Sequence, residues 1–160
     1  MKRRVHVETS VISYLASRPS RDVVVAGRQQ LTHTWWETRR PAFDLVISQV
    51  VLDEIRAGDP EAADRRLALT AGLALLDVTP DVADLAAALI ERVPLPAQAA
   101  ADAAHIASAA CHAVEFVLTW NVTHIANAAL RRRVEAVCVA HGYTAPILCT
   151  PDELMEDPDV

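Results

Sequence analysis

The sequence predicts a single α/β domain over residues 1–160, in which helices cover both faces of a central, mostly parallel sheet of about five short strands. Two observations predict this fold class. Short apolar runs alternate along the chain with longer stretches of helical pattern, as in parallel sheets whose strands are joined by helices. A length of 160 residues suits one domain, and 52% of apolar residues is enough for a buried core.

The strands are predicted from short apolar runs that polar or turn-forming residues bound on either side. In the first run, Val5 and Val7 are expected to point to one side of the sheet, because side chains alternate along a strand. The predicted strands are residues 4–8, 44–47, 73–78, 116–119 and 147–149.

Capping residues and prolines bound the helices of the first half of the chain. Thr9 or Ser10 is expected to cap a short helix that runs to residue 15. Ser20 is expected to cap a long helix over 21–40, which Pro41 ends. Ser48 then caps a helix over 49–57, and another helix begins at 60, after an aspartate and with proline at its first position.

The second half of the chain contains three more predicted helices. The first begins at Thr79-Pro80 and ends before Pro94. An alanine-dense helix covers 97–113, and a helical pattern runs from 122 to about 141. The alternation of strands and helices therefore continues to the last strand.

Charge and cysteine content narrow the classes of function. Fifteen basic and 21 acidic side chains give a formal net charge of −6, so a strongly basic nucleic-acid-binding surface is not expected. An acidic chain can still bind a polyanion when divalent metal ions bridge the two. The three cysteines have no C-x-x-C spacing, which argues against a zinc site or disulfide framework and fits a reducing compartment. No uncharged apolar run is long enough for a membrane span, and we expect a cytoplasmic protein.

Two adjacent tryptophans, Trp35 and Trp36, lie within the long second helix. Stacking on nucleic-acid bases is one role for such a pair. Neighbouring residues of a helix point to different faces, so we expect one of the two to be buried in the core or in a dimer interface.

Four polar residues are expected to collect at one edge of the sheet. Glu8 and Asn121 come at or just after the ends of two strands, Glu54 lies on the helix after the second strand, and Asp102 lies on the alanine-dense helix. Open parallel sheets bind ligands beyond the carboxyl ends of their strands. This edge is therefore the predicted functional site.

The helical position of Glu54 distinguishes it from its neighbour Asp53. At 100° per residue, one apolar arc is defined by Val50, Val51, Leu52 and Ile55. Glu54 falls inside the edge of this arc, between Val50 and Val51, whereas Asp53 falls well outside it. A carboxylate at the edge of the core needs a metal ion, an arginine or backbone N–H groups as a partner.

Asp102 is the lone acid on the packing face of its helix. An ionised, unpaired carboxylate there would cost several kcal/mol. Two interpretations are open from this residue alone, a metal ligand and a structural salt bridge to an arginine such as Arg56.

Three converging carboxylates favour the metal site, because like charges repel in a desolvated site unless a cation holds them. Hard oxygen ligands select Mg²⁺ or Mn²⁺, and carboxylates that hold such ions are typical of phosphodiester hydrolysis. The sequence shows neither a serine or cysteine nucleophile with a placed base nor a glycine-rich phosphate loop.

Four segments in this order resemble the PIN-domain family, and within it the VapC-like toxins of bacterial toxin–antitoxin pairs. The family is a metal-dependent ribonuclease fold. The segments are VETSVISYL at 7–15, SQVVLDEI at 48–55, DAAHIA at 102–107 and LTWNVTHIAN at 118–127. The last of them is similar to a segment found in one subgroup, and the resemblance covers nearly the whole chain.

By this resemblance, Glu8, Glu54 and Asp102 are metal ligands and, with Asn121, the catalytic set of an endoribonuclease that hydrolyses RNA phosphodiester bonds. A cognate antitoxin protein and a homodimer are the implied partners. The first acid of the family is usually Asp, whereas this chain has the longer Glu8. Asn121 stands at a fourth acidic position, so the site carries one negative charge fewer, which fits one tightly held metal ion and weak or narrow activity.

Other polar residues of these segments have roles that the sequence alone does not decide. Asn121 could cap the helix from 122 as well as serve the site. For His124, a hydrogen bond to a backbone carbonyl is preferred over contact with phosphate or a proton. His105 is expected to support the ligands, and Thr9 and Ser10 to cap the first helix and to lie near a metal-bound water.

The departures at Glu8 and Asn121 also support an alternative function. A catalytically degenerate PIN fold could act as an RNA- or protein-binding module. That alternative predicts no loss of function when Asp102 is replaced by asparagine.

Overall fold

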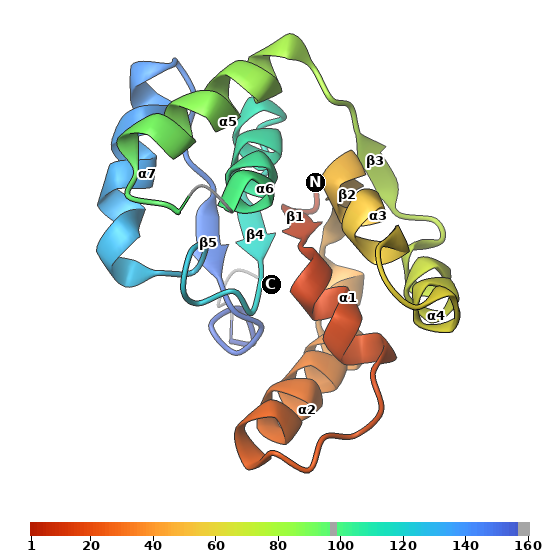
Figure 1. Ribbon diagram of the computed structural model, residues 1–160. Coiled ribbons are helices and arrows are strands. Elements are labelled where there is room, and N and C mark those ends of the chain that lie inside the picture. Colours follow the sequence, from red (N-terminus) through yellow and green to blue (C-terminus); the bar gives the residue numbers. More distant parts are fainter. Residues whose placement is uncertain (97–98, 157–160) are drawn as a thin grey trace.

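The five strands form one parallel sheet in the order β3-β2-β1-β4-β5 (Figure 1). This computed structural model describes residues 1–96 and 99–156. The strands are β1 (Arg4–Val7), β2 (Asp44–Ser48), β3 (Ala74–Leu76), β4 (Phe116–Leu118) and β5 (Ile147–Cys149). Every neighbouring pair is parallel, so the predicted fold class is confirmed.

The direction of chain progression reverses between β1 and β4. The chain moves outward from β1 through β2 to β3 and then returns to the other side of β1 for β4 and β5. Val7 of β1 lies opposite Leu118 of β4, so these two strands end at the same level. In open parallel sheets this reversal leaves a crevice at the carboxyl ends of the two strands, where ligands bind.

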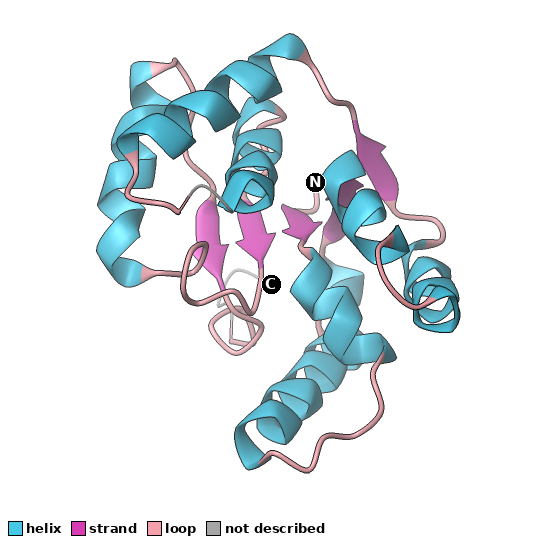
Figure 2. Cartoon of the chain, viewed as in Figure 1, coloured by secondary structure: helices cyan, strands magenta, loops and turns pink. Residues whose placement is uncertain are grey.

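Helices cover both faces of the sheet (Figure 2). One face packs against α1 (Thr9–Ala16), α2 (Val23–Thr38) and α3 (Gln49–Arg56), with α4 (Pro60–Thr70) beside α1 and α3. The other face packs against α5 (Pro80–Arg92), α6 (Ala100–Cys111) and α7 (Ala128–Ala140). A short 3₁₀ helix, η1 (Arg40–Ala42), leads from α2 into β2.

Alternation along the strands divides the core into two layers. Val5 and Val7 of β1 are buried in the cluster beneath α1, α2 and α3, as their spacing predicts. Val46 and Val117, which pair with His6, belong to the cluster beneath α5, α6 and α7. His6 therefore points toward α6, which carries two of the predicted site residues.

Most helix starts in the first half of the chain agree with the sequence, and the caps of α1 and α2 differ. Asp59 caps α4 as predicted, and its Oδ2 accepts a hydrogen bond of 2.8 Å from Ala62 N. The residue that caps α1 is Glu8, one position before the predicted Thr9 or Ser10. Asp22 caps α2 in place of Ser20, because the aspartate oxygen reaches Val25 N at 2.9 Å.

The segment that follows β4 differs most from the prediction. Residues 122–125 form a turn, and α7 begins only at Ala128 with Asn127 as its cap. Asn121 is therefore not the cap of α7, although its Oδ1 accepts a hydrogen bond of 3.0 Å from His124 N in the turn. On the predicted helix 97–113, residues 97–98 lie outside the described residues, and the helix itself runs from Ala100 to Cys111.

Trp35 and Trp36 point to different faces of α2, as adjacent residues of a helix do. Trp35 is fully buried and stacks on Phe43, with ring centroids 5.8 Å apart, so the prediction that one tryptophan enters the core is confirmed. Trp36 is partly exposed and lies beneath the Arg40 guanidinium, 4.4 Å from its ring centroid.

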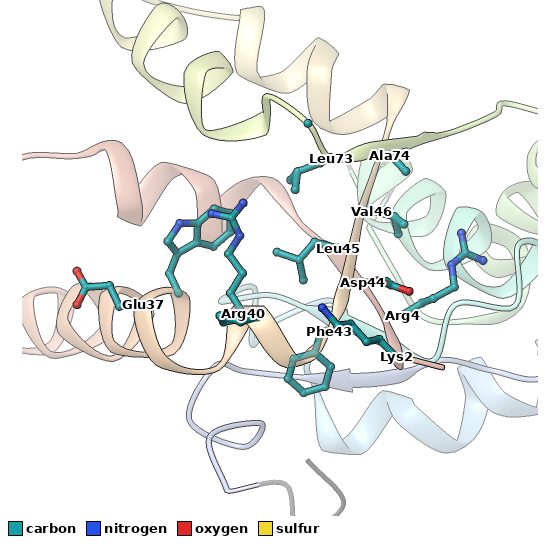
Figure 3. Close-up of a pocket in the computed structure, with 13 residues that line it drawn as sticks. Lys2, Arg4, Glu37, Arg40, Phe43, Asp44, Leu45, Val46, Leu73 and Ala74 are labelled. Atoms are coloured by element: carbon teal, nitrogen blue, oxygen red, sulfur yellow. The ribbon is translucent and has the colours of Figure 1, made fainter.

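Trp36 and Arg40 line a groove of about 880 Å³ (Figure 3). Its other walls include Lys2, Asp44 and Leu73, which precede or begin β1, β2 and β3. The groove thus lies at the amino ends of these strands, opposite the edge where ligands bind to parallel sheets. We therefore place the candidate chemistry elsewhere. Among the described residues, no helix is both long and apolar enough to cross a membrane.

Candidate metal centre at the carboxyl edge of the sheet

The polar residues singled out from the sequence gather at the carboxyl ends of β1 and β4. Glu8 follows β1 directly, and Asn121 stands three residues after the end of β4. Glu54 lies on α3, which follows β2, and Asp102 lies in the first turn of α6. The reversal point of the sheet is therefore lined from four different elements.

Glu8 is buried and its carboxylate is folded back over the start of α1. Its Oε2 accepts hydrogen bonds from Ser10 N at 3.1 Å, from the Ser10 hydroxyl, and from Thr119 Oγ1 at 2.7 Å. Three donors therefore saturate one oxygen of Glu8. No hydrogen bond within the described part of the chain reaches its Oε1. The extra methylene of glutamate over aspartate is used to reach back to the helix that it caps.

Glu54 is half-buried at the edge of the core, whereas Asp53 is exposed, as the helical arc predicts. The Oε1 of Glu54 accepts hydrogen bonds from Thr9 Oγ1 at 2.8 Å and from His105 Nε2 at 2.6 Å. Burial acts to raise the pKa of Glu54. The hydrogen bond and charge of His105, together with the Thr9 hydroxyl, outweigh burial and lower that pKa, which favours the ionised carboxylate.

His105 is fully buried between the two glutamates and a second histidine. Its Nε2 lies 3.7 Å from Glu8 Oε1, and its ring packs edge-on against His6 with centroids 5.5 Å apart. His6 is also fully buried and contacts Ser48 Oγ through Nε2 at 3.2 Å. Burial and the charge of His105 hold the pKa of His6 well below its usual range, so His6 stays neutral at pH 7.

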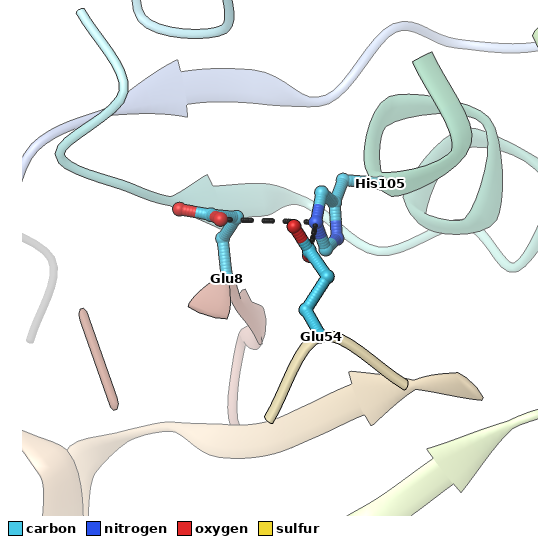
Figure 4. Close-up of side chains that lie close together, drawn as sticks. All are labelled: Glu8, Glu54 and His105. Atoms are coloured by element: carbon cyan, nitrogen blue, oxygen red, sulfur yellow. Dashed lines mark hydrogen bonds and ion pairs between the residues drawn. The ribbon is translucent and has the colours of Figure 1, made fainter. Parts of the chain in front are cut away.

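Glu8, Glu54 and His105 form a group that could hold a metal ion (Figure 4). Their ligand atoms all lie within 4.8 Å of one another. Two carboxylate oxygens and one imidazole nitrogen are donors that divalent cations accept, so the residues present fit a Mg²⁺ or Mn²⁺ ion. Asp102 is outside this group among the residues that the structure describes.

Asp102 belongs to a neighbouring cluster with Asn121 and His124. Its Oδ1 accepts a hydrogen bond of 3.0 Å from Asn121 Nδ2, and its Oδ2 lies 2.8 Å from His124 Nδ1. The salt bridge to Arg56 that the sequence left open is not formed in the described part of the chain. The preferred interpretation of His124 as bound to a backbone carbonyl is wrong, because its Nδ1 contacts the carboxylate of Asp102.

Backbone and hydroxyl groups of the loop after β4 connect the two clusters. Asn121 N donates to Thr119 Oγ1 at 2.9 Å, and this hydroxyl donates to Glu8. Trp120 N donates to Ser10 Oγ at 2.8 Å, and the Ser10 hydroxyl also donates to Glu8. A continuous network therefore joins Asp102, through Asn121 and Thr119, to Glu8.

Sequence reasoning did not single out Thr119 or His6. Thr119 follows an apolar strand directly and precedes Asn121, which was a usable signal because residues at strand ends line this edge. For His6, the signal was a titratable residue flanked by two valines in a strand whose both faces are covered.

Comparison with known proteins supports the fold. No family model and no curated protein sequence matches the chain. Solved structures do match it, and two of them have TM-scores of 0.60 and 0.59. One is VapC20 from Mycobacterium tuberculosis, a toxin that cleaves the sarcin–ricin loop. It is 20% identical, and the match covers 78% of this chain and 95% of that chain. The other is VapBC2 from Rickettsia felis bound to a DNA fragment from its promoter. It is 13% identical, and the match covers 92% of this chain and 98% of that chain.

These similarities define a class of fold. The chain has the PIN-like α/β fold of VapC toxins, as the four sequence segments predicted. Its carboxylates stand at the carboxyl edge of the sheet, as the sequence analysis expected, and the structure places them where the strand order reverses.

Proposed function

We propose that the chain is a Mg²⁺- or Mn²⁺-dependent endoribonuclease, a hydrolase of RNA phosphodiester bonds that acts as the toxin of a toxin–antitoxin pair. One observation carries this proposal. Glu8 and Glu54 each have one oxygen engaged by donors of the fold, and their carboxylates lie beside each other at the carboxyl edge of the sheet. A divalent cation is the partner that such a pair lacks.

Glu8, Glu54 and Asp102 are the proposed ligands of the metal ion. A bound Mg²⁺ or Mn²⁺ supplies positive charge to the scissile phosphate and lowers the pKa of a water molecule for attack on phosphorus. Ser10 and Thr119 hold Glu8 in place, and Thr9 holds Glu54. Asp102 is oriented by Asn121 and His124, so the network described above transmits the position of one carboxylate to the next.

Asn121 adds an amide where another carboxylate would add a negative charge. The site consequently carries three formal negative charges, which suits a single divalent ion and leaves phosphate to complete any second one. His124 is 31% exposed at its side chain, so a bound RNA can reach it, whereas the buried His105 cannot touch a substrate.

The proposed partners follow from the solved structures that share the fold. The VapC20 toxin cleaves the sarcin–ricin loop, and VapBC2 is bound to a DNA fragment from its promoter. We extend to this chain an RNA substrate and a cognate antitoxin that covers the acidic edge, together with a homodimer and a cytoplasmic location.

The deciding experiment is cleavage of a mixed RNA pool by the purified protein, with EDTA, with Mg²⁺ and with Mn²⁺, beside an Asp102→Asn variant. The proposal expects cleavage that requires metal and that the variant loses. Equal cleavage by the variant and the parent, or cleavage in EDTA, would contradict it. The matched control is Asp53→Asn, which removes an exposed carboxylate one residue before Glu54.

A second function rests on one specific observation. Asp102 lies outside the group formed by Glu8, Glu54 and His105 and is held by an amide and an imidazole, so a module that binds RNA or protein without cutting it is the competing candidate. It predicts that RNA or a partner binds equally well to the parent and to Asp102→Asn, and that neither protein cuts.

A further inference from the structure

We infer that His105 is a positioning residue of the metal centre: its Nε2–H fixes one oxygen of Glu54 and so leaves the other oxygen for the cation. This inference deepens the proposed function and rests on it. It assigns to a fully buried histidine on α6 a part in selecting which carboxylate oxygens meet the metal.

The first step is that the two carboxylate oxygens of each glutamate differ in their hydrogen bonds. Glu54 Oε1 accepts two hydrogen bonds, from Thr9 on α1 and from His105 on α6. Glu8 Oε2 accepts three, from Ser10 and Thr119. Within the described part of the chain, Glu54 Oε2 and Glu8 Oε1 accept no hydrogen bond. Each glutamate therefore offers one oxygen that accepts no hydrogen bond from the described residues.

The second step concerns what keeps the two carboxylates together. Two carboxylates that are partly or fully withdrawn from water repel each other. His105 Nε2 lies 2.6 Å from Glu54 Oε1 and 3.7 Å from Glu8 Oε1, so a single N–H group faces both. Because His105 belongs to the helix that also carries Asp102, it ties α6 to α3 and to the end of β1.

The third step concerns whether His105 Nε2 donates a hydrogen bond to Glu54 or binds the metal ion itself. A histidine that binds metal usually donates its other N–H to a carboxylate, a carbonyl or water. His105 Nδ1 is buried and has no hydrogen-bond partner among the described residues, and the neighbouring His6 meets it only edge-on. Metal binding through Nε2 would leave a buried N–H on Nδ1 unpaired, which is costly. The tautomer with hydrogen on Nε2 leaves only an acceptor unpaired, and it makes His105 a donor to Glu54.

Thr9 supplies an independent check, because it holds the same oxygen of Glu54 from the other side. If saturation of Oε1 orients the carboxylate, removal of either donor weakens metal binding. If His105 only packed in the core, replacement of Thr9 would leave metal binding unchanged.

The experiment is calorimetric titration of Mn²⁺ into the metal-stripped full chain. His105→Leu removes the donor at similar volume, His105→Gln restores an amide N–H, and Thr9→Val removes the second donor. Ile106→Val is the matched control, since it loosens the core at the next residue of α6 without touching a carboxylate. Circular dichroism reports whether each variant is folded.

We expect roughly 10- to 100-fold weaker Mn²⁺ binding for His105→Leu and a smaller loss in the same direction for Thr9→Val. His105→Gln should recover most of the affinity, and Ile106→Val should bind as the parent does. If His105→Leu proves unfolded, Thr9→Val and His105→Gln still decide the matter, because both keep the core filled.

Three results would overturn the inference. Parent-like affinity in folded His105→Leu or in Thr9→Val would show that neither donor orients Glu54. Complete loss of binding in both His105 variants would make the imidazole a ligand. Absence of Mn²⁺ binding by the parent would refute the inference and the proposed metal site together, whereas parent binding with an unaffected His105→Leu refutes the inference alone.

Discussion

Asp102 Oδ2 and His124 Nδ1 lie 2.8 Å apart, so the acid of α6 is held by a ring from the turn that follows β4. A second carboxylate–histidine pair, Glu54 and His105, forms three residues further along the same helix. The two pairs differ in exposure. His105 is fully buried, whereas His124 is 31% exposed. The imidazole of His105 therefore belongs to the interior of the site and that of His124 to its rim.

Replacement of His124 by alanine is expected to lower RNA cleavage by about tenfold while changing stability by less than about 1 kcal/mol. The imidazole orients Asp102 but covers little apolar surface at its partly exposed position. The measurement pairs kcat/KM on a defined RNA with urea unfolding. His141→Ala is the control, because the His141 ring bonds the carbonyl of Val137 at the far end of α7. Equal activities of the two variants would remove His124 from the site.

Glu54→Gln is expected to weaken Mn²⁺ binding by at least roughly tenfold, because it removes one of the charges that hold the cation. Asp53→Asn removes the same charge from the adjacent, exposed position and should bind Mn²⁺ as the parent does. Both changes keep the shape of the side chain. Calorimetry on the two proteins checks the prediction, and an equal loss in both would point to a general charge effect in place of a ligand.

Much of the fold was predictable because its signals are local. Each strand is a short apolar run, and caps such as Asp59 act within three residues of themselves. The carboxyl edge was predictable as well, since strand ends in a parallel sheet meet there. Glu54 could be assigned to the inner side of α3 from helical angles alone.

The pairing within the site was not predictable, because it depends on contacts between distant segments. Glu54 bonds His105 across 51 residues, and Asp102 bonds His124 across 22. Residues 122–125 were predicted to begin a helix that runs to about 141, whereas they form a turn beside the contact of Asn121 with Asp102. The local sequence pattern indicates neither these pairings nor this turn.

Thr32→Val is expected to destabilise the protein by about 1–3 kcal/mol. Trp120, which follows Thr119 in the loop of the site, donates its indole N–H to Thr32 Oγ1 on α2 at 2.7 Å. Both side chains are buried, so valine would leave the indole N–H without a partner. Urea unfolding measures the loss. Thr32→Ser keeps the hydroxyl and should lose less, and equal losses in the two variants would mean that the methyl group, and not the hydrogen bond, stabilises this contact.

Cys138 and Cys149 are expected to resist alkylation in the native protein. Burial raises the pKa of Cys138 to about 11 and that of Cys149 to about 12, so at pH 8 only roughly one Cys138 in a thousand and one Cys149 in ten thousand is the reactive thiolate. Labelling should rise about tenfold for each unit of pH between 8 and 10, because the pH approaches each pKa from below. Mass spectrometry after a pulse of iodoacetamide measures each cysteine separately.

Denatured protein supplies the reference for this prediction. In urea all three thiols regain ordinary pKa values and should label at similar rates, whereas in the folded chain the half-buried Cys111 should label first. Because Cys149 ends β5, beside the loop that carries Thr119, its labelling also reports whether that edge of the sheet opens. Fast native labelling of Cys149 at pH 8 would mean that β5 separates from β4 in solution, and the network that holds Glu8 through Thr119 would then be only intermittently formed.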